Sequence, residues 1–154
     1  MQSTLSSAYA SNLFTHLYPH STITITFHIL SQDGSLLAAC INAGTLALID
    51  AGIPMADYLV ACTSGSTSSF MVAAQTADPL LDLNGQEEMD VPWLTVGTVG
   101  AGEKVSVLVV DTKVRVERLE GMLAVGVDGC QQVREILDGV VRRKGKRMVE
   151  DGAG

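Results

Sequence analysis

The segment from Ser35 to Asp50 constrains the fold more than any other part of this chain. Read as a helix, it is apolar on almost every side, and Asn42 and Gly44 are small or polar breaks suited to close packing. A helix of this kind is covered by neighbouring elements rather than by water. Gly52 and Pro54 then end it in the order usual after a helix. We therefore expect this helix to lie buried between other elements.

The segment before this helix has the period of a strand. Residues 22–30 alternate between polar and apolar side chains, which is typical of a half-buried strand rich in β-branched residues. The apolar side of this predicted strand consists of Ile23, Ile25, Phe27 and Ile29. Residues 4–17 carry apolar side chains at helical spacing, and Pro19 is the predicted end of that helix.

The rest of the chain adds strands and one long helix. We predict a short strand at 57–63, an extended piece at 80–83, a hairpin formed by 92–99 and 104–110, and a last helix from Val116 to Arg143. Residues 64–78 have no periodicity and are predicted to be a loop. This order predicts a two-layer α/β or α+β domain at residues 1–145, followed by a flexible tail at 146–154.

Charge and cysteine content exclude several classes of function. The net charge is -7 and the pI about 4.7, so the chain lacks the basic surface that general nucleic-acid binding requires. Cys40, Cys62 and Cys130 lie far apart and have no zinc-ligand spacing, so we predict reduced core thiols in an intracellular protein. No apolar run approaches the ~18 residues that cross a bilayer, and we expect no membrane partner.

Two charged groups leave a functional and a structural interpretation open. Arg142, Arg143 and Lys144 could contact RNA, or could be a solvated helix end where cations are favourable. Asp78 and Asp82 lie four residues apart next to an acidic run, and could hold a divalent ion or form an acidic surface loop.

Longer motifs carry a specific resemblance. Residues 20–62 read HSTITITFHILSQDGSLLAACINAGTLALIDAGIPMADYLVAC, and residues 78–88 read DPLLDLNGQEE. Together with WLTVGTVG, KVSVLVVDTKV and the last helix, these motifs resemble the RNase PH family, in particular the exosome core-ring subunit related to the archaeal catalytic subunit. The resemblance implies the RNase PH fold, similar to domain 2 of ribosomal protein S5. Family members are longer, and this chain corresponds to their C-terminal half.

The resemblance also implies which residues would do chemistry. Active relatives attack the 3′ end of RNA with inorganic phosphate, which requires arginines around the phosphate and carboxylates around a divalent ion. The arginine that follows the QDG turn in those relatives falls at Leu37 here. Of their two aspartates, Asp82 matches the second and Thr76 occupies the place of the first, although Asp78 could substitute if the loop shifts. We therefore expect no catalysis, no cofactor and no bound metal, with Asp82 and Asp78 as vestigial candidates.

The resulting expectation is a non-catalytic structural subunit of the RNA exosome ring. It would support 3′-to-5′ RNA processing and degradation, including rRNA maturation and the turnover of mRNA and non-coding RNA. Its partners would be other RNase PH-type ring subunits, cap subunits and RNA in the assembled channel, in the nucleus, nucleolus and cytoplasm. Two alternatives stay open, namely an active phosphate-dependent 3′-to-5′ exoribonuclease and a truncated fragment without function.

Overall fold

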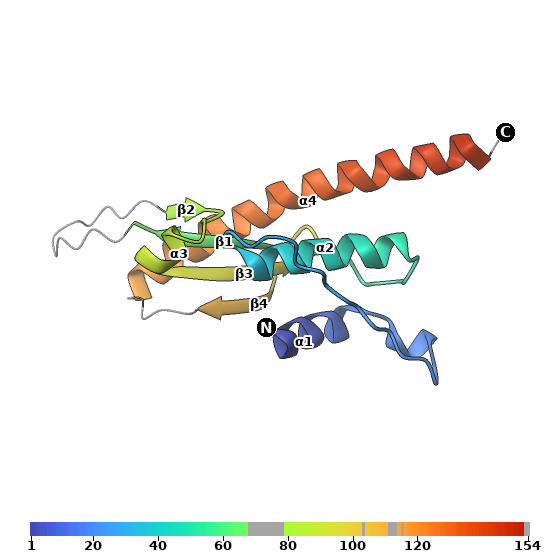
Figure 1. Ribbon diagram of the computed structural model, residues 1–154, viewed down its shortest axis with the longest axis horizontal. Helices are drawn as coiled ribbons and strands as arrows, with labels where there is room; N and C mark the ends of the chain where they lie inside the picture. Colours follow the sequence, from blue (N-terminus) through green and yellow to red (C-terminus); the bar gives the residue numbers. More distant parts are fainter. Residues whose placement is uncertain (68–78, 103, 111–113, 115, 153–154) are drawn as a thin grey trace.

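The computed structural model describes residues 1–67, 79–102, 104–110, 114 and 116–152 (Figure 1). Its described part contains an antiparallel sheet of four strands in the order β2-β1-β3-β4. The strands are β1 (Leu59–Ser66), β2 (Pro79–Leu81), β3 (Trp93–Val99) and β4 (Val105–Val110). The helices are α1 (Gln2–Asn12), the 3₁₀ turn η1 (Thr15–Leu17), α2 (Leu36–Asp50), α3 (Glu87–Asp90) and α4 (Val116–Gly152). This confirms the predicted α+β class.

Strand β1 separates two hydrophobic cores because its side chains alternate between the two faces of the sheet. On one face, Leu59 and Ala61 pack with α1, α2 and Val107 of β4; we call this the first core. On the other face, Val60 and Cys62 pack with β3 and α4; we call this the second core. Helices therefore cover both faces, with α4 along one face and α1 on the other (Figure 1).

Helix α2 lies between the two cores, as its composition predicts. Ile41 and Leu48 belong to the first core, while Leu46 packs against the second. The prediction of burial on every side is wrong for one stripe, since Ala39, Ala43 and Ala47 are exposed. An alanine carries little apolar area, so leaving three of them in water has a small free-energy cost.

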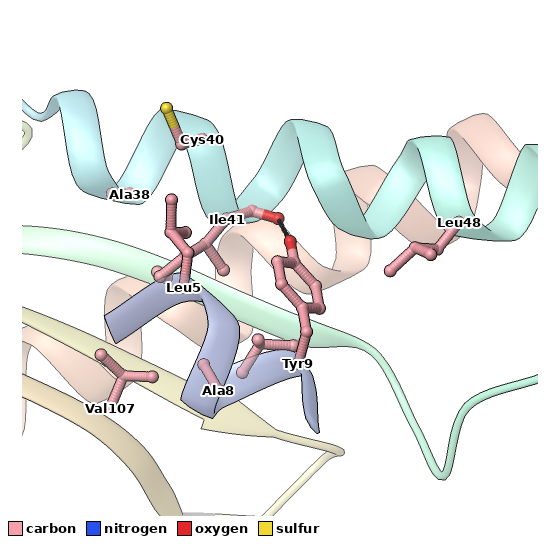
Figure 2. Close-up of a cluster of buried hydrophobic side chains, with 10 residues drawn as sticks. Leu5, Ala8, Tyr9, Ala38, Cys40, Ile41, Leu48 and Val107 are labelled. Carbon is pink, nitrogen blue, oxygen red and sulfur yellow. Dashed lines mark hydrogen bonds between the residues drawn. The ribbon is translucent and has the colours of Figure 1, made fainter. Parts of the chain in front are cut away.

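Tyr9 connects α1 to α2 inside the first core (Figure 2). Its hydroxyl donates a hydrogen bond of 2.6 Å to the Ile41 carbonyl. Gly44 allows this approach, because a Cβ atom there would lie 2.3 Å from the Tyr9 hydroxyl. Burial raises the pKa of Tyr9, so the phenol keeps its proton and remains a donor.

The predicted strand at residues 22–30 is wrong in this structure. Its apolar alternation is real, since Ile23, Ile25 and Phe27 pack against the first core while Thr24 and Thr26 are exposed. A strand also needs a hydrogen-bonded neighbour, and the described residues supply none to this segment.

Two predicted helix ends are also wrong. The first helix stops at Asn12 instead of continuing to Leu17, because Leu13 turns away to form an antiparallel bridge with Met55. The last helix continues past Arg143 to Gly152, through the first part of the predicted tail at 146–154. Gly145 alone does not stop it, because a single glycine costs a helix only about 1 kcal/mol.

Gly126 and Gly121 give opposite predictions on the same helix. An alanine Cβ at Gly126 would lie 2.6 Å from Val96 Cγ1, in the packed interface between α4 and the sheet, whereas nothing lies within 4 Å at Gly121. Gly126→Ala should lower the free energy of unfolding by about 1–3 kcal/mol through overpacking. Gly121→Ala should raise it by about 0.5–1 kcal/mol through helix propensity. Urea unfolding of both variants tests this, and equal shifts would contradict the described packing of α4.

Candidate functional site

The candidate site lies where the turn before α2 meets the segment that joins β2 to α3. Gly34 has a φ of +79°, and a Cβ atom there would lie 2.2 Å from the Leu83 carbonyl oxygen. Only glycine allows two backbones to come this close. The sequence resemblance placed candidate phosphate and metal residues on these two segments, and the structure brings the segments together.

Hydrogen bonds between side chains and backbone groups hold this junction together. The Ser35 N–H donates to Glu88 Oε1 at 2.7 Å, and the Ser35 hydroxyl donates to the Leu83 carbonyl at 3.1 Å. The Gly85 N–H donates to Asp33 Oδ1 at 3.1 Å. The Glu88 carboxylate thus lies at the N-terminal end of α2, where a negative charge is favourable. Sequence reasoning missed this contact, because its two residues are 53 positions apart.

Asn84 organises the other side of the junction. Its side-chain oxygen accepts hydrogen bonds from the N–H groups of Gln86 and Glu87, at 3.0 and 2.9 Å. Its own N–H donates to Glu87 Oε2 at 2.9 Å. This is the reciprocal arrangement of a capping box, and it lies in the turn just before α3, whose N-cap residue is Gln86. Two carboxylates of the acidic run at residues 86–90, those of Glu87 and Glu88, therefore form hydrogen bonds within the fold.

The predicted catalytic positions are not assembled into a metal site in the described residues. Asp82 is exposed and has a φ of +57°, and its N–H donates to the Thr63 carbonyl at 2.8 Å. Leu37 packs against the first core. Thr76 and Asp78 lie outside the described residues. Within the described part of the chain, no group of three His, Cys, Asp or Glu side chains is placed to hold a metal ion.

The positions of Lys and Arg in the sequence are a further signal, and they could have indicated that this junction has no cationic side chain of its own. All ten Lys and Arg residues occur at or after Lys104, so α2 and the segment from β2 to α3 contribute none. Across the described residues, the carboxylates of Asp33, Asp82 and Glu88 form no ion pair. The junction holds two loops together, and its own segments contain no Lys or Arg side chain to clamp an anion.

The predicted basic group lies on the far part of α4. Arg142 forms an ion pair of 2.7 Å with Asp138, and Lys144 pairs with Asp50. Arg143 is exposed and has no ion-pair partner among the described residues. This part of α4 projects beyond the sheet (Figure 1), away from α3.

The three cysteines are free and buried. Burial is the main cause that raises the pKa of Cys62 to about 11, and the nearby Cys130 and Asp82 add to it. Desolvation also raises the pKa of Cys40 and Cys130. The thiols therefore have the properties of core residues rather than of nucleophiles. No helix in the described part of the chain has the length and apolarity to cross a membrane.

Comparison with known proteins shows the family. Models of domain 1 and domain 2 of the 3′ exoribonuclease family match residues 1–54 and 57–129, which meet between α2 and β1. The chain belongs to the 3′ exoribonuclease (RNase PH) family. The exosome complex component SKI6 of Saccharomyces cerevisiae is 37% identical over 99% of this chain and 59% of its own length. The RRP41 homologue of Arabidopsis thaliana is 40% identical over 88% of this chain and 54% of its own length.

Human RRP41, also named an exosome complex component, is 34% identical over 90% of this chain and 54% of its own length. The chain thus spans between half and three fifths of these relatives. The crystal structure of rice Rrp46 superimposes with a TM-score of 0.80 at 20% identity, covering 91% of this chain and 63% of that one. This likeness confirms the RNase PH fold.

The Glu88 contact can be tested by a neutral replacement. Glu88→Gln should lower the free energy of unfolding by about 0.5–2 kcal/mol, because the N-terminal end of α2 loses a charged hydrogen-bond acceptor. Asp90→Asn is the matched control, since Asp90 is exposed and lies on the same short helix. Chemical unfolding of both variants measures the difference. An equal effect of the two substitutions would mean that the contact with Ser35 adds nothing beyond the general loss of charge.

The Cys62 thiol predicts a pH dependence. Its pKa is 9.0 when unfolded and about 11 when folded, so the folded state holds the proton more tightly. The contribution of the Cys62 thiol to the free energy of unfolding is fully present below pH 9, and it is lost as the pH rises from 9 to 11. The loss should approach about 2–3 kcal/mol. Cys62→Ala should flatten the stability curve over this window in urea titrations. The interpretation fails if wild type and variant keep the same slope.

Proposed function

We propose that this chain is a non-catalytic structural component of an RNA exosome ring, which supports 3′-to-5′ RNA processing and degradation. The observation that carries this proposal is the absence of any Lys or Arg before Lys104. The candidate site is built entirely from that part of the chain. Phosphorolysis would bring inorganic phosphate beside an RNA phosphate, and this chain's own site offers no Lys or Arg side chain to offset their repulsion.

Leu37 supports the same proposal in more detail. Active relatives are expected to place a phosphate-binding arginine at this position, whereas Leu37 packs against the first core. A leucine neither donates a hydrogen bond nor carries a charge. Removal of one preorganised charge-stabilising group commonly reduces a rate by about 10²–10³. The loss of this arginine together with a carboxylate should leave no measurable phosphorolysis.

Assembly is supported by the relatives that share the sequence. The yeast, plant and human proteins are each named exosome complex components. We infer that the chain pairs with other RNase PH-type ring subunits and with cap subunits, and that RNA passes through the assembled channel. The processes would be rRNA maturation and the turnover of mRNA and non-coding RNA, in the nucleus, nucleolus and cytoplasm. Exposed Arg143 is the first candidate for an RNA contact, with Arg142 and Lys144 beside it.

Reconstitution tests both parts of the proposal. The chain, co-expressed with RNase PH-type ring subunits, should co-purify with them in a stoichiometric complex. That complex, given poly(A) and inorganic phosphate, should release no nucleoside diphosphates. Leu37→Arg should not restore release, because a single arginine leaves the other missing groups absent. A phosphorolytic archaeal exosome, assayed in parallel, shows that the assay detects the product.

The outcomes separate the three candidate functions. Release of nucleoside diphosphates that stops in Asp82→Asn would establish an active exoribonuclease and overturn the proposal. Failure to co-purify with any ring subunit would favour a fragment without function. A stoichiometric complex without phosphorolysis supports the structural role.

A further inference from the structure

Half of the cations in this chain lie in six consecutive residues of α4. The sequence from 142 to 147 is RRKGKR, so five of the ten Lys and Arg residues occur there. The rest of the chain contains the other five, together with all seventeen Asp and Glu residues. We call residues 142–147 the basic hexapeptide. A cluster of this density in an acidic chain is a local electrostatic feature and does not follow from the overall composition.

The basic hexapeptide is open to a partner. Every residue from 142 to 151 is exposed, and this end of α4 projects beyond the sheet (Figure 1). Arg142 and Lys144 each form one ion pair, with Asp138 and Asp50 respectively. Both pairs lie at the surface, where water screens them and they stabilise little. The other three cations of the hexapeptide have no ion pair among the described residues.

The five cations do not share one face of the helix. Successive residues of an α-helix are rotated by about 100°, so adjacent cations point to all sides of the axis. A partner lying beside the helix would reach only some of them at once. In an extended chain the same side chains project alternately to two sides, with a rise of about 3.3 Å per residue. A groove with acidic walls could then contact the whole run, so the order of the cations favours recognition of an extended segment.

The end of α4 can release this segment at little cost. Gly145 lies within the hexapeptide, and glycine is a weak helix former. Among the described residues, nothing lies within 4 Å of a Cβ atom built at Gly145, so packing does not require its helical position. Met148 and Val149 are 65% and 71% exposed, so the following turn is not anchored on a core. Unwinding from residue 142 onwards would break two surface ion pairs and leave both cores intact.

We propose that the basic hexapeptide is a nuclear import signal, which binds in extended form to an acidic peptide-binding groove of an import receptor. Short segments rich in Lys and Arg serve this purpose or bind nucleic acid. The RNA contact proposed above for Arg143 needs one side of the helix, whereas receptor binding uses the whole run. The inference deepens the nuclear location given in the proposed function and rests on it only for the destination.

An import assay with purified receptors tests this inference. The full chain, fused to a fluorescent reporter too large to diffuse through nuclear pores, should accumulate in the nuclei of permeabilised cells. The double variant Lys146→Ala, Arg147→Ala should lower the nuclear-to-cytoplasmic ratio about ten-fold, because the groove loses two charged partners. Lys146→Arg with Arg147→Lys keeps both charges and should match wild type. Lys104→Ala, which removes an exposed cation outside the hexapeptide, should also match it.

A glycine substitution separates extended from helical recognition. Gly145→Ala keeps all five cations but favours the helix over the extended form, so binding of the purified full chain to the receptor should weaken by about three- to five-fold. Binding to RNA through one side of the helix would stay unchanged or become stronger. Gly121→Ala is the matched control, because it lies on the same helix, also has open space around its Cβ atom, and is far from the hexapeptide. Fluorescence anisotropy measures both interactions.

Three results would overturn the inference. The first is nuclear accumulation that the double variant leaves unchanged. The second is receptor binding that Gly145→Ala does not weaken. The third is binding of the hexapeptide to poly(A) RNA without binding to the receptor, which would assign this segment to RNA. Because purified receptors are the only added proteins, import together with another exosome subunit is excluded. Co-purification of the same variants with ring subunits measures assembly separately, so this inference and the proposed function can fail independently.

Discussion

The paired hydrogen bonds between Asn42 and Ala61 are the interaction on which the rest of the structure depends. Among the described residues, β2 pairs with Ser64–Ser66 of β1, and no strand pairs with the preceding part of β1 on that edge. Asn42 takes its place, donating to the Ala61 carbonyl and accepting from the Ala61 N–H, each at 2.9 Å. Thr45 adds a bond of 2.6 Å to the Leu59 carbonyl. Buried backbone groups left unpaired would each cost about 1–3 kcal/mol. One helix therefore completes the sheet edge and joins both cores.

Fixing α2 on the edge of β1 also fixes the candidate site. The N-terminal end of α2 then lies beside the segment that leaves β2, and Gly34 allows the two backbones to touch. The geometry resembles an anion site, with a helix N-terminus at its centre, but the group bound there is the chain's own Glu88. An external phosphate carries more charge than an internal carboxylate, and Lys or Arg side chains commonly bind it in addition to backbone N–H groups. The cations of this chain are all at or after Lys104. In the described structure, this helix end therefore joins two segments of the chain.

How much could be predicted from the sequence depends on the range of the interactions. Helix α2, the β3–β4 hairpin and the buried cysteines follow from local patterns and were predicted correctly. The contact between Ser35 and Glu88 was not, because no local pattern links residues 53 positions apart. The strand predicted at residues 22–30 was wrong for a related reason. Periodicity indicates which side chains are buried, but not whether a neighbouring strand exists. The end of α4 was predicted too early, at Arg143, because the helix continues through Gly145 into a segment of otherwise helix-forming residues and ends at Gly152.

The two parts of the chain hold their structure by different means. From β1 onwards, neighbouring strands form a continuous hydrogen-bonded sheet, and α4 packs along one of its faces. The part before β1 has no such ladder in the described residues, and rests on the first core through a few side chains such as Tyr9 and Ile41. Its cohesion comes mainly from apolar burial, which is non-directional and does not restrain residues 22–30 as a ladder would. Local opening should therefore begin there, where backbone amides are already unpaired, while β1 and β3 open only when the whole domain unfolds.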